Sequence, residues 1–300
     1  MLIARRNLLG LTAGGLIAAA CTQEPSSGPS ASKPKVLATM SILADVAQQI
    51  GAPDLEIVSL IGPDQTAHHQ DPKPSELAVF NEISLLLHVG FMLEGWIDRL
   101  PESTGYRGPI IQVSEGIAPI YIEGRIPDPH TWQSFLGLRN YAETITKAYK
   151  ILWPNLATRF ETRLKAYLAA LQAAQETAAA QLAPVRQGRR LIIVPHNSFR
   201  YLGREFNLEF RGIAALSTGA QPSAKAMASL LNDIKGADVA ACFIETEADQ
   251  RLMAQIAKES GAKLGGKLYS ESLSKPDGPA GTSIEMLAYN ISTIAKALAT

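Results

Sequence analysis

A long run without glycine or proline, residues 155–182, separates the sequence into two halves. Alanine, leucine, glutamate, lysine and arginine fill most of it, and all five are strong helix formers. Pro154 suits the first turn of a helix, and Pro184 limits its end. At about 1.5 Å per residue, the run predicts one helix on the order of 40 Å long, a stiff connector between whatever the halves form. The alternative, a coiled-coil partner helix, is disfavoured because the apolar spacing is loose and dominated by alanine.

Both flanking halves alternate short apolar runs, typical of buried strands, with segments whose apolar residues recur at helical spacing. An alternating order of strands and helices favours parallel sheets that are covered by helices. We therefore predict an α/β fold with two Rossmann-like lobes joined by the long helix. The expected strands are 35–40, 55–61, 84–89, 109–113, 191–194, 239–244 and a short one near 267–269; the expected helices are 42–50, one beginning at Pro74, 223–236, 247–260 and 283–298.

The predicted domain organisation has five parts. An export signal over 1–21 is followed by a tether over 22–34, which is rich in serine, proline and glycine and is expected to be flexible. The N-terminal lobe is predicted over 35–150, the linking helix over 151–183 and the C-terminal lobe over 184–300.

The first residues have the layout of a bacterial export signal. Arg5 and Arg6 precede an apolar stretch over 8–20 that is too short and too rich in alanine and glycine for a stable membrane span. The arginine pair favours the twin-arginine route, with Sec export as the alternative. Cys21 follows small residues as in a lipoprotein cleavage site, although Ala18 stands where leucine or valine is usual. Lipidation of Cys21 is preferred over a cut that leaves a soluble periplasmic protein.

Composition removes several classes of function. The 28 basic residues balance the 28 acidic ones, so no overall field attracts nucleic acid, and we expect no nucleic-acid partner. Two cysteines exclude a disulfide-dense scaffold, and Cys242 lies in an apolar run that predicts a buried core position. The nucleotide-binding, serine-hydrolase and HExxH metalloprotease motifs are absent from the sequence.

The sequence has five histidines: His68, His69, His88, His130 and His196. Four of them lie at three separate places where a strand is expected to lead into a loop. The loop of His68 and His69 follows a strand, His130 follows a proline, and His196 follows the strand 191–194. Carboxyl ends of parallel strands are where α/β folds bind ligands. Taken singly, each histidine is more often an ordinary surface or core residue, and the sequence has neither two histidines separated by three to five residues nor a Cys-x-x-Cys pair to indicate zinc.

Five segments together carry a family resemblance. Residues 60–76, ending in Pro-Ser-Glu, resemble a ligand loop, and 128–132 (Asp-Pro-His-Thr-Trp), 196–201 (His-Asn-Ser-Phe-Arg-Tyr) and 268–273 (Leu-Tyr-Ser-Glu-Ser-Leu) resemble three further motifs in the same order. The glycine, glutamate and tryptophan of 90–96 match another landmark. The chain is thus similar to the solute-binding proteins of bacterial ABC importers for zinc and manganese. That resemblance implies two α/β lobes bridged by a long helix, with metal in the cleft between them.

The resemblance also implies the metal ligands: His68 and His130 from the first lobe, and His196 and Glu271 from the second. Three imidazoles favour Zn²⁺, with Mn²⁺ as the alternative, since oxygen ligands suit manganese better. The family usually has aspartate where this chain has Glu271, so a water ligand with Glu271 behind it stays open. Asp277 is a less favoured substitute because its Pro-Asp-Gly context is typical of a turn.

The predicted function is a non-enzymatic receptor that captures a divalent metal ion outside the inner membrane and delivers it to an ABC permease. We expect a monomer, periplasmic or anchored to the outer face of the cytoplasmic membrane only through a lipid on Cys21. The alternative is a periplasmic zinc-dependent hydrolase with a three-histidine site, which requires that Glu271 does not bind the metal. Among the other candidates, His69 is expected to be a solvated loop residue, His88 a core residue and Trp132 a structural wall near the site.

Overall fold

The computed structural model describes residues 32–65, 72–122, 124–214, 237–245 and 250–299, together with residues 228, 232 and 234. The predicted export signal, most of the tether, and both His68 and His69 lie outside the described residues. So does most of the helix expected over 223–236. Residues 33–300 form one compact unit, so the division into lobes at 150 and 184 stays a prediction.

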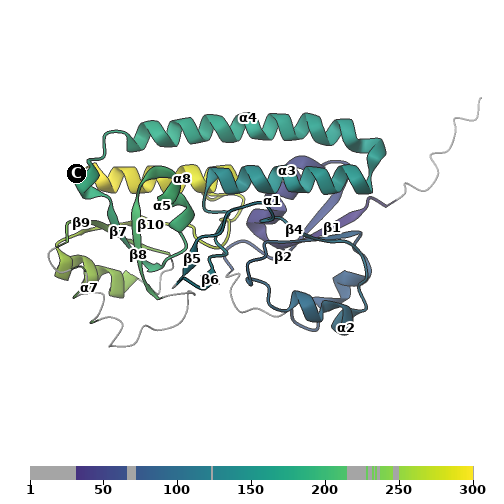
Figure 1. Cartoon of the computed structure of the whole chain (residues 1–300), viewed down its shortest axis with the longest axis horizontal. Helices are drawn as coiled ribbons and strands as arrows, with labels where there is room; N and C mark the ends of the chain where they lie inside the picture. Colours follow the sequence, from purple (N-terminus) through teal and green to yellow (C-terminus); the bar gives the residue numbers. More distant parts are fainter. Residues whose placement is uncertain are drawn as a thin grey trace, which may run out of the picture. The chain divides into compact units, whose positions relative to one another are not determined.

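The first half builds a four-stranded parallel sheet in the order β2-β1-β3-β4 (Figure 1). Its strands are β1 (Lys35–Met40), β2 (Glu56–Ile61), β3 (Leu85–His88) and β4 (Ile110–Gln112). The interior strand β1 is almost wholly buried, as expected for a mainly apolar strand covered on both faces. Helix α1 (Ser41–Gly51) follows β1 directly and buries one side against the sheet.

The second half repeats this plan with a parallel sheet in the order β10-β9-β7-β8. Its strands are β7 (Leu191–His196), β8 (Glu209–Ala214), β9 (Val239–Ile244) and β10 (Lys263–Lys267). All six residues of β7 are buried, and its last residue is His196. The remaining described elements of this half are α5 (Arg200–Phe206), α7 (Gln250–Ser260), α8 (Ser283–Leu298) and the short η4 (Gln187–Arg189).

Two long helices connect the halves. Helix α3 (Phe135–Leu152) ends the first half, a short 3-10 turn η3 (Pro154–Leu156) follows, and α4 (Ala157–Leu182) runs back alongside α3 and α8 (Figure 1). One apolar core extends through both sheets and these helices, with Phe160 of α4 fully buried within it. The predicted α/β class, with a sheet in each half and a long linking helix, is confirmed.

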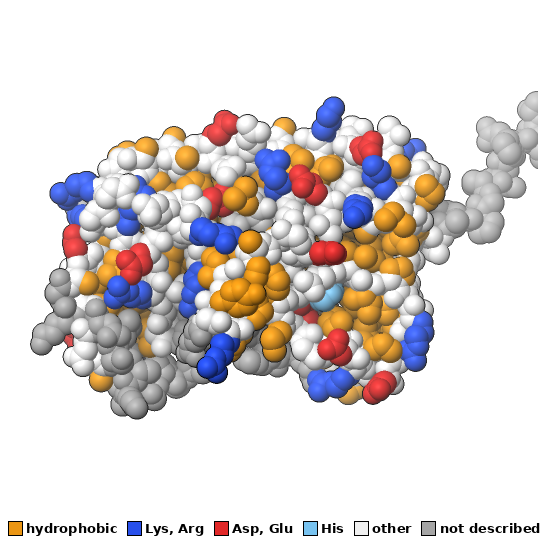
Figure 2. All heavy atoms as spheres, in the orientation of Figure 1, with side chains coloured by type: hydrophobic (Ala, Val, Ile, Leu, Met, Phe, Trp, Pro, Cys, Tyr) orange, Lys and Arg blue, Asp and Glu red, His pale blue; other side chains and the backbone are white. Residues whose placement is uncertain are grey.

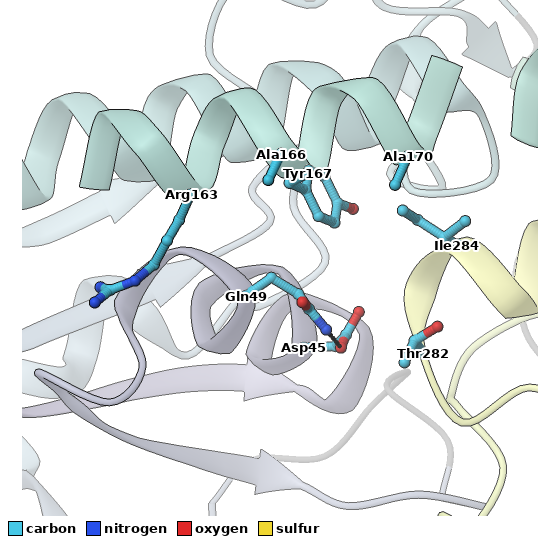
Figure 3. A pocket seen from close by; sticks show the side chains of 8 residues that line it. All are labelled: Asp45, Gln49, Arg163, Ala166, Tyr167, Ala170, Thr282 and Ile284. Carbon is cyan, nitrogen blue, oxygen red and sulfur yellow. Dashed lines mark hydrogen bonds between the residues drawn. The ribbon is translucent and has the colours of Figure 1, made fainter. Parts of the chain in front are cut away.

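A carboxylate near this linking helix joins the two halves. A cavity of about 250 Å³ lies between α1, α4 and the start of α8, and Figure 3 shows Asp45 and Gln49 of α1 facing Tyr167 of α4 across it. Asp45 Oδ2 accepts hydrogen bonds from the backbone N–H and the hydroxyl of Ser283, at 2.7 and 2.6 Å. The Tyr167 hydroxyl lies 3.0 Å from the same Ser283 hydroxyl. One partly buried acid thus ties α1 of the first half to the amino end of α8, where the helix dipole favours negative charge.

Two predicted elements are placed differently by the structure. No α-helix begins at Pro74; turns there lead into the short 3-10 helix η1 (Leu77–Asn81), of which only Phe80 is buried, so no apolar face sustains an α-helix. The strand expected near 267–269 lies earlier in the chain, as β10. Pairing with β9 holds this segment as a strand although it contains two glycines.

Several elements were not predicted at all. Helix α3 has a clear signal in hindsight, because the Ser134 side chain caps it and its apolar residues recur at helical spacing. The others are β8, α5, η4, the 3-10 helix η2 (Ile97–Arg99), the short helix α2 (Leu100–Thr104) and the hairpin β5 (Tyr121–Ile122) with β6 (Ile126–Pro127).

Other sequence features behave as expected. Cys242 is a buried free thiol in β9, which confirms its core position. Within the described residues, no helix combines the length and apolar character that crossing a bilayer requires. On the face drawn in Figure 2, basic and acidic side chains are interspersed over the surface, in keeping with their equal numbers.

Candidate metal centre

The structure brings three of the four predicted metal ligands together. One ligand atom each from His130, His196 and Glu271 lies within 4.8 Å of the others, and all three residues are buried. His130 comes from the first half of the chain, and the other two come from the second half. The fourth predicted ligand, His68, lies outside the described residues.

His196 reaches the group as the last residue of β7. Because β7 lies inside its sheet, between β8 and β9, its carboxyl end delivers the imidazole into the interior and not to the surface. The His196 Nδ1 atom is 3.6 Å from Glu271 Oε1, and its ring centroid is 4.7 Å from that of His130. This is the position at the end of a parallel strand that the sequence indicated.

His130 is held in one orientation by Asp128, two residues earlier. The Asp128 Oδ1 atom lies 2.9 Å from the backbone nitrogen of His130 and 2.6 Å from its Nδ1. Since an ionised carboxylate only accepts hydrogen bonds, Nδ1 carries the proton, and Nε2 offers its lone pair. Burial lowers the pKa of His130, which keeps the imidazole neutral and able to bind a cation.

Asp128 is in turn braced by helix α5, which follows His196 in the chain. Arg200 Nη1 donates to Asp128 Oδ2 at 3.0 Å, and the Tyr201 hydroxyl donates to the Asp128 carbonyl at 2.9 Å. Burial by itself would raise the pKa of Asp128, but the hydrogen bonds from His130 and Arg200 bring it below its ordinary value. The arginine and tyrosine of the 196–201 motif therefore support the histidine of the other half.

Glu271 is the only carboxylate in the group of three found among the described residues. It follows Ser270, whose carbonyl accepts a hydrogen bond from the indole nitrogen of Trp132 at 2.7 Å. Trp132 is fully buried, and its ring also packs edge-on against His130, at 5.0 Å between centroids. The predicted wall role of Trp132 thus includes a polar contact with the segment that carries Glu271.

A second acid beside the group, Glu245, was not predicted. It is buried directly after β9, accepts the backbone N–H of His196 at 3.3 Å through Oε1, and accepts the hydroxyl of Ser270 through Oε2. Its Oε2 lies 3.8 Å from His196 Nδ1. Burial raises the pKa of Glu245. The available sequence signal was an acidic residue at the exit of a buried strand, which is the same signal that marked His196.

The remaining candidates lie elsewhere or outside the described residues. The His88 side chain is 13% exposed at the end of β3, and its Nδ1 atom lies 3.7 Å from Glu94 Oε2. Glu94 accepts hydrogen bonds from Thr39 and from backbone N–H groups of the turn after β3. This buried acid therefore stabilises the turn. Asp277 is exposed in a turn and does not belong to the group.

The donor set fits a divalent cation. Two imidazoles and one carboxylate converge in a site screened from solvent, and neutral histidine with a single acid is a set that zinc binds readily. The Asp128–His130 pair has the carboxylate–histidine arrangement that usually supports a metal-bound imidazole.

Comparison with known proteins points the same way. Residues 36–297 match the family model described as "Zinc-uptake complex component A periplasmic". The chain is 25% identical over 293 residues to a metal ABC transporter substrate-binding lipoprotein of Streptococcus sanguinis, covering 93% of this chain and 94% of the relative. It is 26% identical over 296 residues to a manganese ABC transporter substrate-binding lipoprotein of Streptococcus gordonii, covering 94% of each.

Solved structures agree with the fold. A manganese-bound mutant of a periplasmic metal-binding protein from Candidatus Liberibacter asiaticus aligns with a TM-score of 0.82 at 26% identity, covering 89% of this chain and all of that one. The periplasmic zinc-binding protein of Treponema pallidum aligns with a TM-score of 0.83 at 24% identity, covering 90% of this chain and all of that one, and shows the fold alone. Since the family model spans nearly all of the described chain, this protein belongs to the family of the periplasmic component A of the zinc-uptake complex.

Proposed function

We propose that this protein captures a divalent metal ion, zinc before manganese, outside the cytoplasmic membrane and delivers it to an ABC permease. Its family and relatives make it a periplasmic-type substrate-binding protein of a metal ABC transporter. The observation that carries the proposal for this chain is the buried meeting of His130, His196 and Glu271 from its two halves. His68 is the proposed fourth ligand, so that four protein groups enclose the ion.

The preference for zinc rests on nitrogen donors. Relatives carry different metals in their names: manganese for the Streptococcus gordonii protein, and iron for a lipoprotein of Streptococcus pyogenes that is 25% identical over 305 residues. In this chain the end of β7 supplies an imidazole, His196, and imidazole suits zinc, whereas manganese prefers oxygen ligands. Glu271 is the one proposed oxygen donor.

A competition titration on protein without residues 1–33 tests the proposal. We expect one zinc ion per chain, bound tightly enough to resist displacement by excess manganese. If manganese displaces zinc, the preference is wrong and the receptor function stands. If neither ion binds tightly, the proposed capture of metal is wrong.

The relatives also bear on the enzymatic alternative. They are named as substrate-binding lipoproteins of transporters, which confirms the prediction of a non-enzymatic protein. Nothing in the comparisons supports a zinc-dependent hydrolase. Four protein ligands would leave no open position for the water nucleophile that such an enzyme needs.

We further propose that Cys21 carries the lipid that holds the protein at the outer face of the membrane, in line with the lipoprotein names of the relatives. The protein is proposed to act as a monomer. Mass spectrometry of protein extracted from membranes would give the lipid mass on Cys21. Recovery of an unmodified amino-terminal cysteine from the soluble fraction would contradict the anchor.

Replacing Asp128 by alanine is expected to weaken zinc binding by about 10- to 100-fold, the usual effect of removing the partner of a metal-bound histidine. The change removes the acceptor that fixes the proton on His130 Nδ1 and leaves Arg200 without its carboxylate. Competition with a zinc chelator measures the affinity. An unchanged affinity would show that the orientation of His130 does not depend on Asp128.

Acid is expected to release the metal. Binding requires neutral imidazoles, and burial lowers the pKa of His130 below its ordinary value, so protons begin to compete only below about pH 6.5. We therefore expect a nearly constant zinc affinity from about pH 8 to 6.5, and a loss at lower pH that steepens towards about tenfold per pH unit for each ligand once the pH lies below the pKa of that ligand. Titrations across this range check the prediction; an affinity that rises on acidification would contradict it.

A further inference from the structure

The side chains of Trp132 and Gln133, which follow His130, donate hydrogen bonds to the segment that carries Glu271. The Gln133 side chain is fully buried, and its Nε2 donates hydrogen bonds to the carbonyls of Tyr269 and Ser270, each at 2.8 Å. The indole nitrogen of Trp132 donates to the Ser270 carbonyl at 2.7 Å. These carbonyls belong to the two residues directly before Glu271.

Asn290 of α8 completes the attachment from the other side. Its Nδ2 donates to the Tyr269 carbonyl at 2.8 Å, and its Oδ1 accepts the Tyr269 N–H at 2.9 Å. The same Nδ2 lies 3.4 Å from Gln133 Oε1, so the two buried amides are linked to each other. Both polar groups of the Tyr269 backbone are therefore fixed by side chains that water does not reach.

These contacts hold the distance between His130 and Glu271, two of the proposed ligands. Gln133 is three residues after His130, and Ser270 is one residue before Glu271, so only short stretches of chain separate each ligand from the contact. Moving Glu271 away from His130 would break the bonds of Gln133 and Trp132 to the Ser270 carbonyl in a site that is buried from solvent, where an unpaired polar group is costly.

We infer that Gln133 is a positioning residue that fixes the separation of His130 and Glu271 before metal arrives, which slows metal release and sharpens the choice of zinc over manganese. This inference rests on the proposed metal-binding function. Zinc favours four ligands at short distances, whereas manganese accepts more oxygen ligands in a larger shell. A fixed distance between the His130 nitrogen and the Glu271 oxygen favours zinc, whereas a variable distance also accommodates manganese.

The test compares wild type with Gln133→Met, which keeps the length of the side chain and removes its hydrogen bonds. Asn140→Leu is the matched control, because Asn140 also donates its amide to two backbone carbonyls, of Val113 and Glu115, but touches no ligand segment. For Gln133→Met we expect zinc affinity to fall by about 10- to 100-fold, mainly through faster dissociation, together with a smaller zinc-to-manganese affinity ratio. The control is expected to keep the wild-type rate and ratio.

Trp132→Phe provides a second variant that retains an aromatic ring and loses only one bond to the Ser270 carbonyl. Its zinc dissociation, followed by stopped-flow capture with a chelator, is expected to lie between wild type and Gln133→Met. Wild-type rates and metal preference in both variants would overturn the inference and leave the proposed function standing. Failure of wild type to bind either ion would overturn the proposed function and this inference with it.

Discussion

His196→Ala is expected to lower zinc affinity by at least about 100-fold, because loss of a ligand should cost no less than the largest effects of residues that merely support one. The substitution removes an imidazole donor from the end of β7 and leaves Glu271 and Glu245 facing the space that it filled. Chelator competition gives the affinity, and thermal melting of the metal-free protein separates loss of binding from loss of folding.

Two further variants sharpen this expectation. His196→Glu places an oxygen donor at the same position and should move the preference towards manganese. His88→Ala is the matched control, since His88 is also a mostly buried histidine at the end of a parallel strand but is not one of the grouped residues. Equal losses of zinc affinity in His88→Ala and His196→Ala would contradict a specific role for His196.

Phe160→Ala should reduce the free energy of unfolding by about 3–5 kcal/mol, the range for truncating a buried aromatic residue. Most of α4 is exposed, and Phe160 is one of the few side chains that fasten it to the core, where its ring lies 5.2 Å from that of Tyr149 in α3. Urea unfolding at constant slope measures the change.

The neighbouring exposed Thr162→Ala serves as the control for that experiment and should stay within about 0.5 kcal/mol of wild type. If Phe160→Ala costs no more than this control, α4 is not part of the cooperative core. The long helix would then be an appended connector, and the single core that extends through both halves would be the wrong description.

Local sequence patterns predicted those elements that carry a clear signal within their own segment. β1 is a short apolar run, α1 and α8 carry apolar residues at helical spacing, and α8 also carries a capping box formed by Thr282 and Glu285. Strand β10 has no such signal, because its two glycines disfavour a strand. A side chain at Gly265 would lie 2.3 Å from the ring of Phe243 in β9, so the glycine there serves a close approach between strands that only the fold reveals.

The same distinction applies to the site. His130, His196 and Glu271 could be proposed because each stands in a short segment that resembles a known motif. Glu245 lies 49 positions from His196, and Gln133 lies 137 positions from Ser270. No local pattern links residues so far apart: the contact of Glu245 with His196 forms when the second sheet assembles, and that of Gln133 with Ser270 forms when the two halves come together.

Anomalous diffraction from crystals of the zinc-loaded protein, recorded at the zinc absorption edge, tests the metal site most directly. We predict a single peak about 2.0–2.2 Å from a nitrogen of His130, a nitrogen of His196 and a carboxylate oxygen of Glu271. A peak that lies beyond bonding distance of these three side chains would contradict the proposed site.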